Sequence, residues 1–168
     1  MEQDPKVVGR FVTLRDGPQT DTSALRAGAS RRVESHPGPF RILLAEDDDE
    51  MRCVLADALR RDGYDVVELA DGEGFLEMAA RLGVGADRDL VDLIVSDVRM
   101  PVCGGLEVLS ALRNACCHVP VILMTAFGDE ATRRHAARLS AVLFDKPFDL
   151  DDLRTAARSL LAGDPPGR

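Results

Sequence analysis

Residues 93–101 read LIVSDVRMP, an apolar run that ends in a carboxylate, Asp97, with Pro101 four residues further on. The apolar part is short and rich in β-branched side chains, which favours a strand buried on both faces, as the strands of parallel sheets are. Pro101 and the pair Gly104-Gly105 then supply turn residues. We therefore expect Asp97 at the carboxyl end of a central strand, the edge where open α/β sheets bind their ligands.

The composition is that of a globular protein of ordinary polarity. The chain of 168 residues is 45% hydrophobic and 30% charged, and its net charge is −8 with histidine counted as neutral. Its length predicts one domain with a substantial core. No apolar run approaches the roughly 18 residues of a membrane span, and the N-terminus lacks the apolar segment of a secretory signal. We therefore expect a cytoplasmic protein that does not enter a membrane and, given its acidity, does not bind nucleic acid directly.

Residues 1–39 differ in composition from the rest of the chain. They contain prolines at positions 5, 18, 37 and 39 and scattered glycine, serine and threonine, which predicts a mostly disordered N-terminal extension. A partner-binding arm is the alternative for this segment. Ordered structure is expected over residues 40–163, and residues 164–168 form a short tail whose prolines prevent it from continuing a helix.

Five short apolar strands alternate with five amphipathic helices between residues 40 and 163. The strands are expected at 41–45, 64–69, 91–97, 120–124 and 141–144. In the first helix, Val54 is one of the apolar residues expected on the buried face. Residues 71–74, DGEG, are expected to form a turn before the second helix, and residues 83–89 a loop after it. Strict β-α alternation implies a doubly wound α/β fold with a parallel sheet and helices on both faces.

Polar side chains stand at the carboxyl ends of four of these strands. Glu46 and Asp47 follow the first strand, Asp97 ends the third, Thr125 follows the fourth and Lys146 follows the fifth. Because the carboxyl ends of parallel strands lie on one edge of the sheet, these side chains can converge although they are far apart in the sequence.

The residue types at this edge suit phosphoryl chemistry. Three carboxylates in one pocket repel one another unless a cation lies among them, and hard oxygen ligands with room for water suit Mg²⁺. A lysine and a hydroxyl on the other side suit the oxygens of a phosphoryl group. Such a site can stabilise a phosphoryl group that moves in line onto one of the carboxylates.

Four segments at these strand ends resemble the motifs of the response regulator receiver domain, namely AEDD at 45–48, IVSDVRMP at 94–101, MTA at 124–126 and DKPF at 145–148. The resemblance extends from Phe40 to about Leu161. It implies a CheY-like, flavodoxin-like (βα)5 sheet with the strand order 2-1-3-4-5. It also implies a cis peptide bond between Lys146 and Pro147.

The resemblance further implies a role for each residue of the site. Asp97 would accept a phosphoryl group from the phosphohistidine of a histidine kinase or a histidine phosphotransfer protein. Mg²⁺ would be held by Glu46, Asp47, Asp97 and the backbone carbonyl of Arg99. Thr125 would hydrogen-bond the phosphoryl group and move on activation, and Lys146 would neutralise its charge. Such a protein is a signalling switch of a two-component system or phosphorelay that promotes its own phosphorylation and dephosphorylation, and is not a turnover enzyme.

The output is expected to pass through contact with a downstream protein. Few residues follow the fifth helix, as in stand-alone receivers, and a phosphorylation-dependent homodimer is a further arrangement that the resemblance allows. The family's docking or dimer surface is formed by the fourth helix, the fifth strand and the fifth helix. In this chain the surface carries five arginines, which predicts an acidic partner: Arg133, Arg134, Arg138, Arg154 and Arg158.

Two other functions fit parts of the pattern. A receiver-like scaffold that works without phosphorylation would tolerate Leu143, which stands where the family usually has a switch aromatic, while Phe144 alternates to the other face. A hydrolase of the haloacid dehalogenase type needs a second acid two residues after the nucleophile, where this chain has Arg99.

Arg99 and Phe127, which follows Thr125 by two residues, flank the expected phosphoryl position, and we predict that they set the lifetime of the phosphorylated state.

Overall fold

A computed structural model describes residues 38–83 and 91–163 of the protein. Nearly all of the predicted N-terminal extension, most of the loop predicted at 83–89 and the tail at 164–168 lie outside the described residues. Within the two described ranges, none of the helices combines the length and the apolar character that a bilayer crossing requires.

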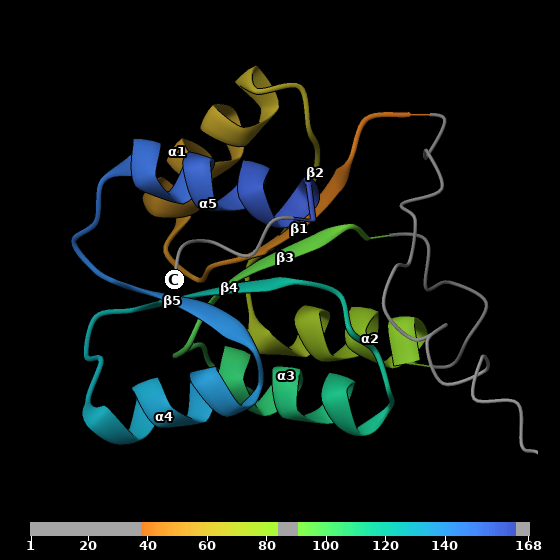
Figure 1. The fold of residues 1–168 in the computed structure, drawn as a ribbon, viewed down its shortest axis with the longest axis vertical. Coiled ribbons are helices and arrows are strands. Elements are labelled where there is room, and N and C mark those ends of the chain that lie inside the picture. Colours follow the sequence, from red (N-terminus) through yellow and green to blue (C-terminus); the bar gives the residue numbers. More distant parts are fainter. Residues whose placement is uncertain (1–37, 84–90, 164–168) are drawn as a thin grey trace, which may run out of the picture. The chain divides into compact units, whose positions relative to one another are not determined.

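Five parallel strands form one sheet in the order β2-β1-β3-β4-β5, as predicted (Figure 1). The strands are β1 Arg41–Ala45, β2 Asp65–Leu69, β3 Leu93–Asp97, β4 Val121–Thr125 and β5 Ala141–Asp145. The bounds of β1 are as predicted, and those of the other four strands differ from the predicted ones by one or two residues at an end. The central strand β3 is buried along its whole length, because helices cover both faces of the sheet.

The five helices divide between the two faces of the sheet (Figure 1). They are α1 Asp49–Arg61, α2 Gly72–Gly83, α3 Gly105–Asn114, α4 Glu130–Arg138 and α5 Leu150–Leu161. Helices α1 and α5 cover one face, and α2, α3 and α4 cover the other. Side chains of successive strand residues point to opposite faces, so Ile42 and Leu44 join the core under α1 and α5, whereas Leu43 and Ala45 join the core on the other side.

The prediction that Val54 lies on the buried face of the first helix is wrong. Val54 is 55% exposed, whereas Leu55, Ala58 and Leu59 are buried. Consecutive helical residues are about 100° apart around the axis because a turn takes 3.6 residues. The apolar stripe of α1 is therefore narrower than its sequence suggests, and Val54 falls outside it.

The turn predicted at residues 71–74 is largely helical. Helix α2 begins at Gly72, and the Asp71 carboxylate accepts a hydrogen bond from the Gly74 N–H group at 2.8 Å. A Cβ atom on Gly72 would lie 1.9 Å from the carbonyl oxygen of Cys103. Glycine is therefore needed here because the start of α2 packs directly against the backbone that connects β3 to α3.

Candidate functional site

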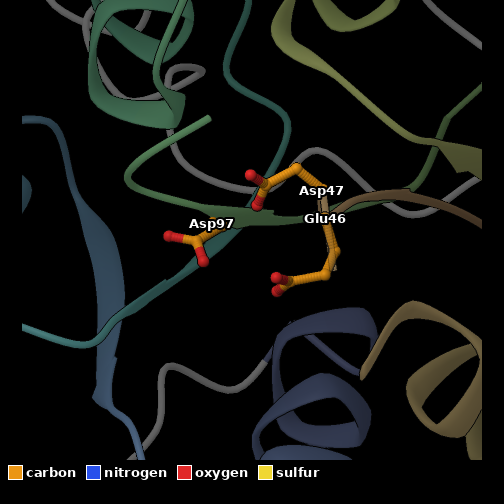
Figure 2. A group of neighbouring side chains, drawn as sticks. All are labelled: Glu46, Asp47 and Asp97. Carbon is orange, nitrogen blue, oxygen red and sulfur yellow. The ribbon is translucent and has the colours of Figure 1, made fainter. Parts of the chain in front are cut away.

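The carboxyl edge of the sheet brings together the acidic residues predicted from the sequence. Glu46 and Asp47 directly follow β1, and Asp97 is the last residue of the adjacent strand β3. One carboxylate oxygen of each residue lies within 4.8 Å of those of the other two. Figure 2 shows the carboxylates of Glu46 and Asp47 extending toward the side on which Asp97 lies. This set of hard oxygen ligands fits Mg²⁺, which binds carboxylates and keeps several waters.

Lys146 directly follows β5, the edge strand that lies on the opposite side of β3 from β1, and its side chain reaches the same cluster. Its Nζ atom lies 2.8 and 3.0 Å from the two carboxylate oxygens of Glu46 and 2.5 Å from Oδ2 of Asp97. The Lys146–Pro147 peptide bond is cis, as predicted. One ammonium group therefore compensates the charge of two carboxylates that come from different strands.

Burial shapes the protonation of this cluster. Glu46 is only 1% exposed, and this burial raises the pKa of its carboxyl above the ordinary value, against the lowering effect of the hydrogen bond from Lys146. Burial also disfavours the charged form of Lys146, but hydrogen bonds and attraction to Asp97 and Glu46 outweigh it and raise the pKa of the ammonium. Lys146 is therefore a cation at neutral pH.

Asp97 is held by contacts on both carboxylate oxygens. Oδ1 accepts a hydrogen bond from the Arg99 N–H group at 2.8 Å, and Oδ2 contacts Lys146. Beneath it, a Cβ atom on Gly105 would lie 2.4 Å from the carbonyl oxygen of Asp97, so the start of α3 packs closely against the end of β3. The carboxylate is almost buried, and its orientation is fixed by its neighbours.

Thr125 ends β4 at the same edge and is fully buried. Its hydroxyl oxygen accepts a hydrogen bond from the backbone N–H group of Phe127 at 3.2 Å. Its carbonyl oxygen accepts one from the backbone N–H group of Lys146 at 2.7 Å. The backbone of Thr125 is therefore tied to Lys146, while its hydroxyl faces the connection between β4 and α4.

Residues 42–158 match the family model of the response regulator receiver domain. The chain belongs to this family. The general role of receiver domains is that of a phosphorylation switch in two-component signalling, and they generally bind Mg²⁺ at an acidic cluster.

Relatives of the receiver domain include both short and longer proteins. This chain is 28% identical over 122 residues to sporulation initiation phosphotransferase F of Bacillus subtilis, a match that covers 72% of this chain and 93% of that protein. It is 34% identical over 122 residues to the transcriptional regulatory protein CpxR of Escherichia coli, covering 72% of this chain and 49% of CpxR. The chain thus spans about half the length of CpxR. The solved structure of the chemotaxis protein CheY4 of Vibrio cholerae gives a TM-score of 0.61 at 25% identity, covering 73% of this chain and 99% of CheY4.

Leu143 stands where the resemblance to the family predicts a switch aromatic. Leu143 packs against the core on the side of α2, α3 and α4, whereas Phe144 packs against the core on the side of α1 and α5. The Phe144 ring contacts that of Phe148 edge to face, with centroids 5.5 Å apart. Phe144 therefore points away from α4 and cannot substitute for an aromatic at position 143.

The basic surface predicted on α4, β5 and α5 is partly neutralised within the receiver domain. Arg133 forms a salt bridge of 2.7 Å with Asp145. Arg154 binds Asp151 and also Asp62, at the end of α1, through two nitrogens. The Arg154 guanidinium therefore joins α5 to α1 and is less available to a partner than the exposed arginines of this surface.

Arg52 was not among the site residues predicted from the sequence, although it contacts the site. It lies one turn into α1, and its Nη1 atom donates a hydrogen bond to the backbone carbonyl oxygen of Glu46 at 2.8 Å. The sequence offers only a weak signal for this contact, an arginine three residues after Asp49 at the start of a helix. That spacing predicts the pairing with Asp49 but not the reach back to β1.

Proposed function

We propose that this receiver domain is a phosphorylation switch whose phosphoacceptor is Asp97. The donor is the phosphohistidine of a histidine kinase or of a histidine phosphotransfer protein. The observation that carries the proposal is the contact of one Lys146 ammonium with both Glu46 and Asp97, with the Asp47 carboxylate within 4.8 Å of theirs. Family membership supports the reaction class.

Phosphoryl transfer breaks the P–N bond of the donor histidine and forms an O–P bond to the Asp97 carboxylate, while the bonding electrons stay with the imidazole nitrogen. Asp97 is oriented for this step by the Arg99 N–H group and by Lys146. Such chemistry depends mainly on positioning and charge compensation. The protein therefore promotes its own phosphorylation and is not a turnover enzyme.

The proposed Mg²⁺ ligands are the carboxylates of Glu46, Asp47 and Asp97 together with the backbone carbonyl of Arg99. When bound, Mg²⁺ supplies positive charge that compensates the phosphoryl oxygens during transfer. Lys146 supplies a second positive charge on the side of β5, and the Thr125 hydroxyl supplies a hydrogen bond from β4. The support for these roles is the convergence of the residues at one sheet edge.

We propose that the signal leaves through protein contact at the surface of α4, β5 and α5, either with a downstream protein or with a second copy of the phosphorylated chain. Arg134, Arg138 and Arg158 are exposed on this surface, which favours an acidic partner. Thr125 connects the site to this surface, because it leads directly into the segment that precedes α4.

The test is intact mass spectrometry of the protein incubated with Mg²⁺ and acetyl phosphate. We expect one phosphoryl adduct on the wild type, none on Asp97→Asn, and one on Asp57→Asn, the control in which an exposed carboxylate of α1 is changed. Absence of an adduct on folded wild-type protein, or an undiminished adduct on Asp97→Asn, would overturn the proposal. The former outcome favours a scaffold that works without phosphorylation.

A further inference from the structure

Arg52 joins three elements that meet beside the acidic site. From α1, its Nη1 atom donates to the carbonyl oxygen of Glu46 at the end of β1. Its Nη2 atom contacts the carboxylate of Asp49, and its Nε atom lies 3.6 Å from Oε2 of Glu68 on β2. The Arg52 side chain is only 14% exposed. The Glu46 carbonyl and the Glu68 carboxylate, both on the sheet, thus hold the guanidinium of this α1 residue beside the acidic site.

The carbonyl that Arg52 binds belongs to the peptide that links Glu46 to Asp47. The N–H group of Glu46 donates to the carbonyl oxygen of Leu69 at 3.1 Å, so both backbone polar groups of Glu46 are held. Because a peptide unit is planar, fixing this carbonyl fixes the plane that joins the α-carbons of Glu46 and Asp47. With the Glu46 N–H group also held, the backbone of Glu46 is restricted on both sides of its α-carbon. Figure 2 shows that both carboxylates face the space beside Asp97.

We propose that Arg52 is a positioning residue for the cation site, which holds the Glu46–Asp47 peptide so that both carboxylates present oxygens to one divalent cation. The proposal rests on the Mg²⁺ site of the proposed function and is independent of phosphoryl transfer. Arg52 does not touch the cation; it acts through the backbone of its ligands. Contacts of this kind behind metal ligands typically change metal affinity by about 10- to 100-fold.

Two other roles for Arg52 make different predictions. If Arg52 acted only through its charge, its removal would strengthen Mg²⁺ binding, because a nearby cation repels Mg²⁺. If Arg52 served only to fasten α1 to β2, then Arg60 would be equivalent to it. Arg60 is also on α1, and its Nη2 atom lies 2.8 Å from Oε1 of the same Glu68 and 3.0 Å from the carbonyl oxygen of Val66. Arg60 is therefore a matched control for the fastening role.

The experiment measures Mg²⁺ affinity by isothermal titration calorimetry on the full chain, with urea unfolding of each variant alongside. We expect Arg52→Ala to bind Mg²⁺ about 10-fold more weakly than the wild type, and Arg60→Ala to bind it as the wild type does. Arg52→Lys should retain part of the affinity, because a lysine keeps the charge but cannot bridge the same partners. If Arg52→Ala does not fold, the Mg²⁺ affinity of Arg52→Lys relative to that of the wild type tests the proposal instead.

Several results would overturn the proposal. Unchanged or tighter Mg²⁺ binding by folded Arg52→Ala would exclude positioning, as would wild-type affinity in Arg52→Lys when the alanine variant does not fold. An equal loss in Arg60→Ala would show that general fastening of α1 explains the effect. A wild-type protein that does not bind Mg²⁺ would overturn both this proposal and the proposed metal site, whereas Mg²⁺ binding without an effect at Arg52 would overturn this one alone.

Discussion

The guanidinium of Arg99 lies over the ring of Phe127, with its carbon 5.1 Å from the ring centroid. Arg99 belongs to the connection after β3 and Phe127 to the connection after β4, so the contact joins the segments that follow Asp97 and Thr125. The Phe127 residue is 67% exposed. A stack between a cation and an aromatic face at an exposed position contributes about 0.5–1 kcal/mol.

We predict that this stack slows loss of the phosphoryl group by restricting the two segments beside it. Arg99→Ala and Phe127→Ala should each accelerate autodephosphorylation by about two- to five-fold, the rate equivalent of the stack's free energy. The double variant should be no faster than either single one, because all three lack the same contact. Decay of the phosphorylated mass after removal of acetyl phosphate measures these rates. Unchanged single-variant rates, or multiplicative effects in the double variant, would show that the stack has no such role.

Lys146→Met should destabilise the protein at pH 7 when Mg²⁺ is absent. It leaves Glu46 and Asp97 facing each other without a cation, and the loss of unfolding free energy should reach up to about 3 kcal/mol. Burial raises the pKa of the Glu46 carboxyl in the folded protein above its ordinary value of 4.5. Glu46 therefore contributes fully to the stability of the fold below pH 4.5, and this contribution is lost as the pH rises through the pKa of the folded state. The effect of the substitution should therefore shrink as the pH is lowered.

Urea unfolding of the wild type and Lys146→Met, from pH 7 down to below pH 4.5, measures how the loss of unfolding free energy depends on pH. In a Glu46→Gln background the same substitution should cost less, because only one charged carboxylate then faces the missing ammonium. An equal cost in both backgrounds would mean that Lys146 stabilises the fold through packing of its stem and not through its charge.

Asp62 should stabilise the protein in a pH-dependent manner through Arg154. Hydrogen bonds from Arg154 lower the pKa of the Asp62 carboxyl below 3.8, so its contribution is present above pH 3.8 and is lost as the pH falls through the lower folded value. We expect Asp62→Asn to lower the unfolding free energy at pH 7 and to lower it by less near pH 3, where part of the contribution is already lost. Chemical denaturation at both pH values provides the measurement.

Asp65→Asn is the control for this prediction. Asp65 pairs with Arg41 at 2.7 Å, but both side chains are about two-fifths exposed, at 41% and 42%, and such pairs contribute little. If Asp62→Asn lowers the unfolding free energy at pH 7 by no more than Asp65→Asn does, the salt bridge between Asp62 and Arg154 has no special stabilising role.

Val102 adopts a left-handed backbone conformation with φ of 72° and is 79% exposed. This conformation is costly for a β-branched residue, and the side chain gains little burial in return. Val102→Gly should therefore raise the unfolding free energy by about 1 kcal/mol. Val102→Ala should gain less, because alanine keeps the Cβ atom. Thermal and urea unfolding test both, and a destabilised glycine variant would refute the argument.

The sequence alone was sufficient to predict the fold and most of the candidate site. Alternation of apolar strands with amphipathic helices leads to a parallel sheet for a general reason, since each element must bury its apolar face. Polar residues at the ends of parallel strands then share an edge of the sheet. Glu46, Asp97 and Lys146 could therefore be assigned to one site before any distance was known.

Only the tertiary structure decided which groups touch across elements. Arg52 binding the Glu46 carbonyl, Arg154 joining Asp62, and Arg99 covering Phe127 all depend on how separate segments pack. Periodicity predicts which face of its own element a side chain occupies, but a long side chain can meet several partners within reach of that face. The choice among them is set by packing between segments distant in the sequence, and local pattern carries no information about it.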